Sequence, residues 1–216
     1  WGHNVMAAVA GASKPDEFEM RAVVLGHIQR GGGPNAEDHI ISRAYGVAAI
    51  EAERRVGEIQ AIGQVLYPTE QIKDAFWNES ARNLFLGLTL YVVETPSLPC
   101  SLGEVLRQAS GKGQPIKDYL QNLITIRANS DAPLSDDCTA ALHRFCATSE
   151  NTMASILATL TAPLTIFSNP IVDAATSATD FDLKQVRAQR MSIYVGIPAN
   201  RLSDAALLVN LFFSQL

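Results

Sequence analysis

The sequence changes character near residue 54, from a glycine-interrupted segment to a series of helix-forming segments. The run Gly31–Gly32–Gly33–Pro34 can continue neither a helix nor a central strand, so it predicts a loop. Before it, residues 21–28 are rich in Val and Ile and predict a short buried strand. After it, residues 38–53 predict a helix. The first part is therefore expected to be a strand–Gly-loop–helix fragment of α/β type.

Beyond residue 54 the apolar residues recur at helical spacing. In residues 76–93 this spacing places five side chains on one helical face, and we expect them to be core rather than a base-stacking platform. They are Trp77, Ala81, Leu84, Leu88 and Tyr91. The remaining segments indicate a fold that is mainly α with α/β parts. Helices are predicted over 116–127, 135–148, 151–161 and 202–216, a loop is predicted between Pro163 and Pro170, and a strand is predicted over 191–197.

Two short motifs bear on helix ends and on nucleotide binding. Ser101 and Glu104 have the spacing of a capping box, in which the serine accepts from an amide and the glutamate reaches back. The segment Ser110–Gly–Lys–Gly113 lacks the first glycine of a phosphate-binding loop and the hydroxyl after Lys112. It is therefore expected to be the C-terminal turn of a helix.

Composition excludes several classes of protein. A net charge of −5 and a pI of about 5.4 leave no broad basic face for nucleic acid or anionic lipid. Three cysteines cannot build a disulfide framework, which indicates a reducing compartment. The longest apolar run, 84–93, is shorter than the ~20 residues that a membrane helix requires. Because the first residue is Trp1, we expect a soluble piece of a longer chain.

The densest polar cluster comprises Arg21, His27 and Arg30, followed by the free amides of the glycines. These groups suit a phosphate ester; the alternative is a solvated loop. Elsewhere, Cys138, His143 and Cys146 fall on one predicted helix at offsets that do not build a tetrahedral metal site. No metal site is therefore predicted.

The spacing Arg21-x4-Gly26-His27-Ile28-Gln29-Arg30-Gly31-Gly32-x5-Asp38 resembles the signature of the ATP-dependent phosphofructokinases. In that family the matching Arg, His and Arg hold the phosphate of fructose 6-phosphate, and a neighbouring subunit completes the site. The resemblance implies substrate-binding roles for Arg21, His27 and Arg30. His39 departs from the signature, and the ATP-binding and catalytic parts of such an enzyme are absent.

A second resemblance covers about three quarters of the chain. It consists of an ordered set of segments that is similar to the TraG/VirD-like coupling proteins of type IV secretion. The segments are 59–68 (IQAIGQVLYP), 76–88 (FWNESARNLFLGL), 102–107 (LGEVLR), 151–157 (NTMASIL), 180–183 (DFDL) and 191–198 (MSIYVGIP).

This resemblance implies an all-helical insertion domain plus a partial RecA-like α/β nucleotide-binding core. The implied organisation is a phosphofructokinase-like fragment at 1–53, a helical domain at 54–150 and part of the core at 151–216. It also implies a DNA–relaxase substrate, other type IV secretion components as partners, a hexameric ring, and the cytoplasmic part of an inner-membrane protein. ATP and Mg²⁺ would be cofactors of the complete protein and not of this fragment. The phosphate-loop pattern G-x-x-x-x-G-K-[ST] is absent and the second nucleotide motif would lie beyond residue 216, so no ATPase activity is expected of this chain alone.

Three interpretations stay open: a coupling-protein segment, a sugar-phosphate-binding remnant of a kinase, and a helical protein–protein interaction module without catalysis. A chimeric join near residue 54 explains two unrelated resemblances more simply than a functional fusion does.

Overall fold

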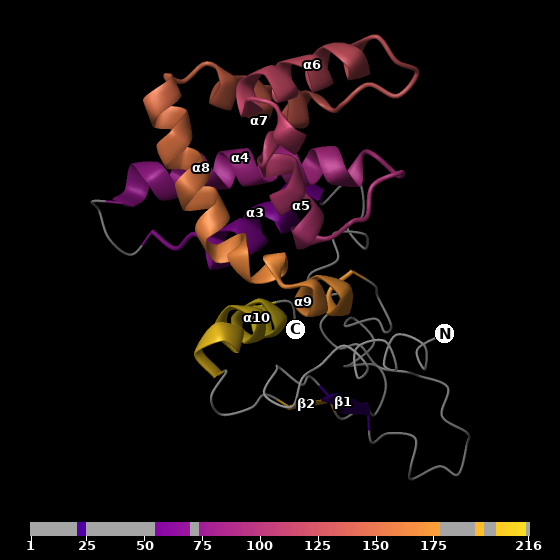
Figure 1. Ribbon diagram of the computed structural model, residues 1–216, viewed down its shortest axis with the longest axis vertical. Helices are drawn as coiled ribbons and strands as arrows, with labels where there is room; N and C mark the ends of the chain where they lie inside the picture. The colour runs from indigo at the N-terminus through magenta and orange to yellow at the C-terminus, as the bar shows by residue number, and fades with distance from the viewer. Residues whose placement is uncertain (1–20, 25–54, 70–73, 178–192, 197–201, 215–216) are drawn as a thin grey trace. The chain divides into compact units, whose positions relative to one another are not determined.

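The computed structural model describes residues 21–24, 55–69, 74–177, 193–196 and 202–214, and these residues are mainly helical (Figure 1). They belong to two compact units. One unit, here called the helical unit, is Val47–Asp173; the other combines Trp1–Gly46 with Ala174–Leu216. The domain limits predicted from the sequence stay predictions.

The helical unit is built around one long helix, α4 (Ala75–Val93), which packs against several others (Figure 1). Its partners are α3 (Arg55–Leu66), α5 (Leu102–Ala109), α7 (Asp136–Cys146) and α8 (Glu150–Leu164). The helix predicted over 76–93 is confirmed, and Leu84 and Leu88 on its predicted face are buried. Trp77 and Tyr91, near the two ends of that face, are only half-buried.

The predicted loop between Pro163 and Pro170 is wrong. Helix α8 continues through Pro163 to Leu164, a 3-10 turn follows, and Pro170 begins the short helix α9 (Pro170–Ala175). Pro163 lies one residue from the helix end, and its missing N–H removes a single intrahelical hydrogen bond, the one to the carbonyl four residues earlier. Tyr67 on the neighbouring segment donates to the carbonyl oxygen of Leu160 at 2.8 Å, which supplies a donor in the turn before Pro163.

Helices α4 and α7 cross closely at Gly87. A Cβ atom at this position would lie 2.9 Å from Leu142 Cδ2 and 3.1 Å from Ala141 Cβ, so a side chain would push the two helices apart. The thiol of Cys138 on α7 donates to the Gly87 carbonyl oxygen across the same crossing, with the two atoms 3.3 Å apart. The glycine therefore serves a close approach between helices.

Helix α6 (Ile116–Ala128) is fastened to the end of α4 by Arg127. Its guanidinium donates from Nε to the Ala132 carbonyl at 2.8 Å, from Nη1 to Thr95 Oγ1 at 2.8 Å and from Nη2 to the Glu94 carbonyl at 2.9 Å. One side chain thus satisfies three acceptors from two connecting segments.

Replacing Arg127 by Met is expected to lower the free energy of unfolding by about 2 kcal/mol, because three acceptors lose a charged donor while the apolar stem is kept. Urea denaturation followed by circular dichroism measures the change. The matched control is Arg144→Met, since Arg144 is exposed and donates to a neutral acceptor, Asn83 Oδ1, at 2.7 Å. Equal losses in the two variants would contradict a special role for Arg127.

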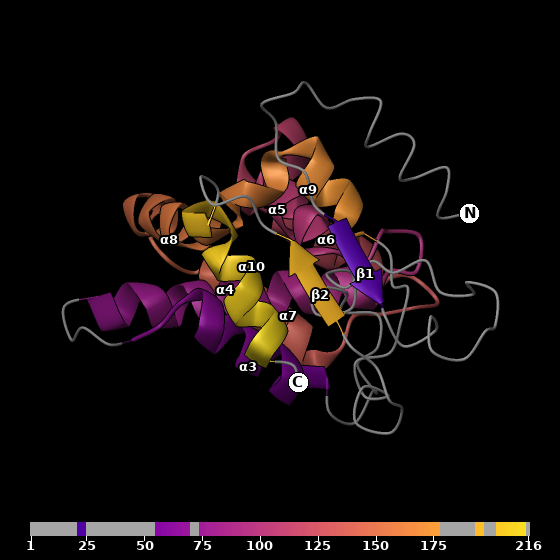
Figure 2. The same ribbon diagram turned by 90° about the horizontal axis from the view of Figure 1, so that it is seen from below.

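The second unit contains two strands and a helix among its described residues. Strand β1 (Arg21–Val24) pairs antiparallel with β2 (Ile193–Gly196), with Arg21 opposite Gly196 and Val24 opposite Ile193 (Figure 2). Both strands fall inside segments predicted to be strands, and α10 (Leu202–Ser214) confirms the predicted last helix. The Gly-rich loop and the helix expected over 38–53 lie outside the described residues, so the strand–loop–helix fragment stays a prediction.

Among the residues that the structure describes, no helix is both long enough and apolar enough to cross a membrane.

Candidate functional site

The three residues predicted to bind a sugar phosphate lie in the first 54 residues, of which the structure describes only β1. The backbone of Arg21 lies at the start of β1, and its side chain is not described. His27 and Arg30 lie outside the described residues. Their substrate-binding roles therefore stay predictions.

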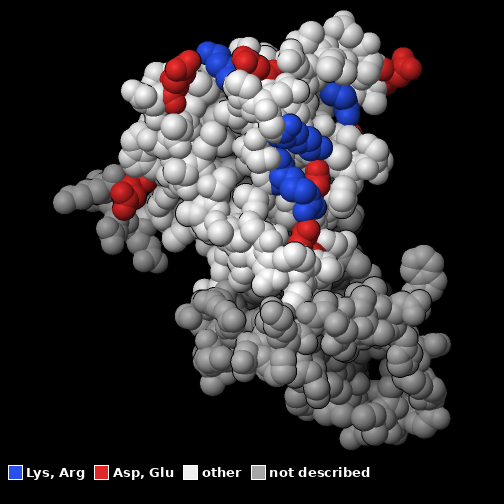
Figure 3. Space-filling model, in the orientation of Figure 1, with Lys and Arg blue, Asp and Glu red and all other residues white. Residues whose placement is uncertain are grey.

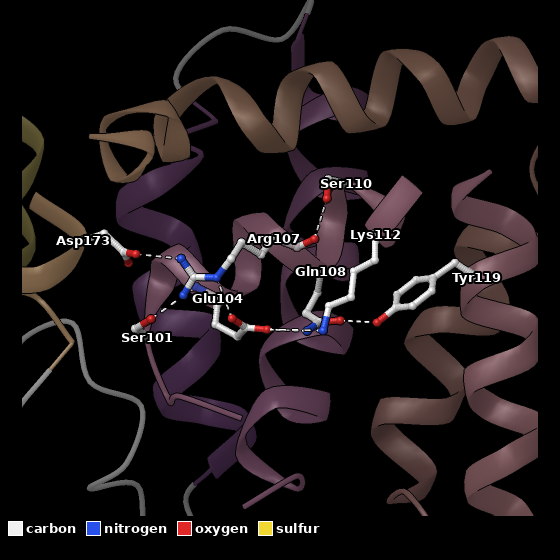
Figure 4. Close-up of polar contacts among 8 residues, drawn as sticks. All are labelled: Ser101, Glu104, Arg107, Gln108, Ser110, Lys112, Tyr119 and Asp173. Carbon is white, nitrogen blue, oxygen red and sulfur yellow. Dashed lines mark hydrogen bonds and ion pairs between the residues drawn. The ribbon is translucent and has the colours of Figure 1, made fainter. Parts of the chain in front are cut away.

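The structure instead brings together polar side chains around α5, which we call the α5 polar cluster (Figure 4). Its central residues are Glu104 and Arg107, one helical turn apart, with Arg107 Nε 2.6 Å from Glu104 Oε2. Glu104 is buried, whereas the Arg107 side chain is 43% exposed. From its outer side Arg107 Nη1 reaches Asp173 Oδ2 on α9, again at 2.6 Å.

The inner side of the same carboxylate is also occupied. Gln108 donates from its side-chain amide to Glu104 Oε1, and Lys112 Nζ lies 3.7 Å from that oxygen. Tyr119 on α6 donates its hydroxyl to the amide oxygen of Gln108. Burial, followed by the neighbouring Tyr91, raises the pKa of the Tyr119 hydroxyl, so it stays protonated and able to donate. Both oxygens of the buried Glu104 carboxylate therefore have hydrogen-bond or ion-pair partners.

Local sequence explains how α5 presents these groups. Positions 104, 107 and 108 fall on one face of a helix, because residues three and four apart are neighbours. Ser101 begins the helix and accepts from the amide of Glu104 at 3.2 Å, which confirms half of the predicted capping box. The other half is wrong: the Glu104 side chain points into the cluster, where Arg107 offers it a charged donor and Gln108 a second hydrogen bond.

The turn that follows α5 confirms the expectation for Ser110–Gly113. Ser110 ends the helix, and Gly111, Lys112 and Gly113 have φ values of 67°, 49° and 87°. Glycines at 111 and 113 suit this left-handed backbone, which L side chains rarely adopt. The turn directs Lys112 back to Glu104 and forms no phosphate-binding loop.

A groove of about 500 Å³ lies beside the α5 polar cluster, within the helical unit. It combines apolar side chains, hydroxyls and the Arg107–Asp173 pair. Its lining residues are Gly103, Leu106, Arg107, Ser110, Thr161, Phe167, Ser168, Pro170 and Asp173. Figure 3 shows a short run of blue atoms in the middle of the face drawn there, with red atoms beside and below it.

The charged groups of the α5 polar cluster pair with one another. In the cluster two cations, Arg107 and Lys112, are matched by two carboxylates, Glu104 and Asp173, so the charges balance. A balanced set favours neither a free phosphate nor a free metal ion. Among the described residues, no group of three or more His, Cys, Asp or Glu side chains is arranged to hold a metal ion.

Cys138 and Cys146 are buried in α7, whereas His143 is exposed on the same helix. The two thiols therefore face the core, whereas the His143 side chain faces the surface of the helix.

The sequence analysis did not identify the α5 polar cluster. The i, i+3 spacing of Glu104 and Arg107 is a local signal that could have suggested their pairing. The contact with Asp173, 66 positions away, has no such signal.

The helical unit thus carries a polar–apolar groove beside a charge-balanced cluster. Comparison with known proteins then gives the family: the model for "Type IV secretory system Conjugative DNA transfer" matches residues 41–216. The chain belongs to this family.

Individual relatives agree with both resemblances found in the sequence. Protein VirD4 of Agrobacterium fabrum is 26% identical over 184 residues, which is 84% of this chain and 26% of that protein. The ATP-dependent 6-phosphofructokinase of Chloroflexus aurantiacus is 50% identical over 46 residues, 20% of this chain and 13% of the enzyme. For 6-phosphofructokinase 1 of Thermus thermophilus the values are 56% over 36 residues, 17% of this chain and 11% of the enzyme. The chain therefore spans about an eighth of the kinases and a quarter of VirD4, and no solved structure matches it.

Proposed function

We propose that this chain is a segment of a type IV secretion coupling protein and that its helical unit recruits the DNA–relaxase substrate. The observation that carries the proposal is the extent of the family match, since 41–216 takes in the whole of Val47–Asp173. The groove supports it, because apolar side chains bordered by hydroxyls and a paired charge suit a polypeptide better than a DNA backbone. On this proposal the helical unit acts as an interaction module without catalysis.

The second unit would supply part of a RecA-like nucleotide-binding core, to which β2 and α10 would belong. In the complete protein, ATP and Mg²⁺ would bind to motifs that this chain lacks, and a hexameric ring at the inner membrane would drive DNA transfer. The pattern G-x-x-x-x-G-K-[ST] occurs nowhere in the 216 residues, which supports the expectation that the chain alone does not hydrolyse ATP.

Binding of a purified relaxase–DNA complex from a conjugative plasmid to the whole chain tests this proposal. Ser168→Trp and Ser110→Trp each place a large ring in the groove, and we expect at least a tenfold weaker Kd, about 1.4 kcal/mol. The matched control is Asn122→Trp, at an exposed position of α6 that does not line the groove. Absence of binding, or equal effects of all three substitutions, would overturn the proposal.

A second function is favoured by one specific observation, the 50% identity to a phosphofructokinase over 46 residues. We propose that Arg21, His27 and Arg30 retain affinity for fructose 6-phosphate. Calorimetric titration with this sugar should then show saturable binding that Arg30→Ala abolishes. Arg43→Ala, the same substitution outside the motif, should leave binding unchanged. If the native chain shows no saturable binding, the motif is a remnant without function.

A further inference from the structure

The last residue of the helical unit, Asp173, forms an ion pair with another residue of the same unit. Asp173 is the last residue of that unit, and α9, which contains it, continues two residues further to Ala175. The end of the unit is thus set within a helix of six residues, too short to be stable by itself. The contacts between α9 and the rest of the helical unit therefore determine where the unit ends.

Asp173 is held through a close approach to α5. A Cβ atom at Gly103 would lie 1.9 Å from Asp173 Oδ1 and 2.8 Å from its Cγ, so any other residue at 103 would displace the carboxylate. Glycine inside a helix costs about 1 kcal/mol relative to alanine. Gly103 is buried within α5. Because it has no side chain, the Asp173 carboxyl group fits against it.

Arg107 completes this attachment and is itself fixed. Its Nε is bonded to the buried Glu104 at 2.6 Å, which orients Nη1 toward Asp173. The outer pair remains accessible, since the side chains of Arg107 and Asp173 are 43% and 23% exposed. Both also line the groove, so a molecule bound there would meet the two groups directly.

We propose that the Arg107–Asp173 ion pair is a latch that holds α9 against α5 and thereby sets the end of the helical unit. With the latch open, residues 170–173 leave the unit and lengthen the connection that follows it. Ion pairs of this exposure shift an equilibrium by no more than about fivefold, so loss of the pair should change the opening equilibrium of α9 by at most about that factor. A groove ligand that engages Arg107 or Asp173 competes with the pair and favours the open form. The inference does not depend on the proposed function.

Hydrogen–deuterium exchange of the whole chain tests the latch. In Arg107→Met, Asp173→Asn and Gly103→Ala, the amides at the C-terminal end of α9 should exchange about threefold to fivefold faster than in the native chain. Amides in the middle of α4 should be unchanged. Arg144→Met removes an exposed arginine that bonds a neutral partner on α4, and it should leave α9 unaffected.

Two further measurements separate a latch from general loosening. The double variant Arg107→Met/Asp173→Asn should speed exchange by less than the product of the two single effects, because the Arg107–Asp173 pair is lost in all three variants. Raising the salt concentration from 0.05 to 0.5 M should speed exchange in α9 of the native chain but not of Asp173→Asn. Unchanged exchange of α9 in Arg107→Met, equal acceleration in α4, or additive effects in the double variant would overturn the proposal.

Discussion

Phe85→Ala is expected to lower the free energy of unfolding of the helical unit by about 3–5 kcal/mol. Phe85 lies in the middle of α4 with none of its surface exposed, and its ring meets that of Tyr67 edge to face, with the centroids 5.9 Å apart. Truncation removes the buried ring and leaves a cavity between α3 and α4. Since domains are stable by only about 5–15 kcal/mol, much of the stability would be lost.

The sequence offers a matched control on the same helix. Phe76 lies near the start of α4, is 59% exposed and contacts Trp77 edge to face at 4.9 Å. Phe76→Ala is the same chemical change at an exposed site, so it should cost less than about 1 kcal/mol. Urea denaturation of both variants, followed by circular dichroism at 222 nm, gives the two values. Equal losses would mean that α4 is not the centre of the core.

Helical periodicity located α4 but described its surroundings incompletely. The pattern assigns one buried face, and Ala81, Leu84 and Leu88 do lie on it. Phe85, which borders that face, and Leu90, which lies opposite it, are buried as well, because α3, α5, α7 and α8 cover the helix from several sides. A single apolar stripe is typical of a surface helix and underestimates the burial of a central one.

Local signals located helix ends well where a side chain marks them. Ser135 begins α7 and accepts from the amide of Cys138, as its position before two aspartates indicated. The interpretation of Pro163 as the start of a loop was wrong. A proline usually marks a helix boundary, whereas Pro163 lies inside the last turn of α8. The helix α9 was missed for the same reason, since Pro170 is its first residue and not the end of a loop.

The α5 polar cluster could be predicted only in part. Glu104, Arg107 and Gln108 share a helical face and could have been grouped from their spacing. Tyr119 and Asp173 reach the cluster through the packing of α6 and α9, which depends on the whole fold. The predicted sugar-phosphate residues differ from this cluster, because the sequence motif identifies them. Two of them, His27 and Arg30, lie outside the described residues.

The thiol of Cys138 is expected to react about a thousandfold more slowly than an ordinary cysteine at pH 8. The side chain is buried in α7, and burial, followed by the nearby Glu94 carboxylate, raises its pKa from 9.0 to about 12, against a smaller lowering by Arg127. Only the thiolate attacks an alkylating reagent. At pH 8 a shift of this size reduces the thiolate fraction by about three powers of ten. The hydrogen bond from Sγ to the Gly87 carbonyl further favours the protonated form.

Alkylation with iodoacetamide, followed by peptide mass spectrometry, measures this reactivity. The chain unfolded in 6 M guanidinium chloride gives the reference rate for the same residue. Cys146 is an internal comparison, since it too is buried and burial raises its pKa. In the native chain the rate at Cys138 should still rise about tenfold per pH unit at pH 10, whereas in the unfolded chain it should level off above pH 9. Modification of native Cys138 at the unfolded rate would contradict its burial.

The same shift links Cys138 to stability at high pH. Below pH 9 the thiol is protonated in both the folded and the unfolded chain, so it adds no pH dependence. Above pH 9 the unfolded chain releases this proton while the folded chain keeps it, and the free energy of unfolding should fall by about 1.4 kcal/mol per pH unit. Cys138→Ala removes the titrating group and keeps a small apolar residue. Urea denaturation between pH 8 and 10.5 should therefore show a shallower decline in Cys138→Ala than in the native chain, and identical slopes would mean that the buried thiol is not held protonated by the fold.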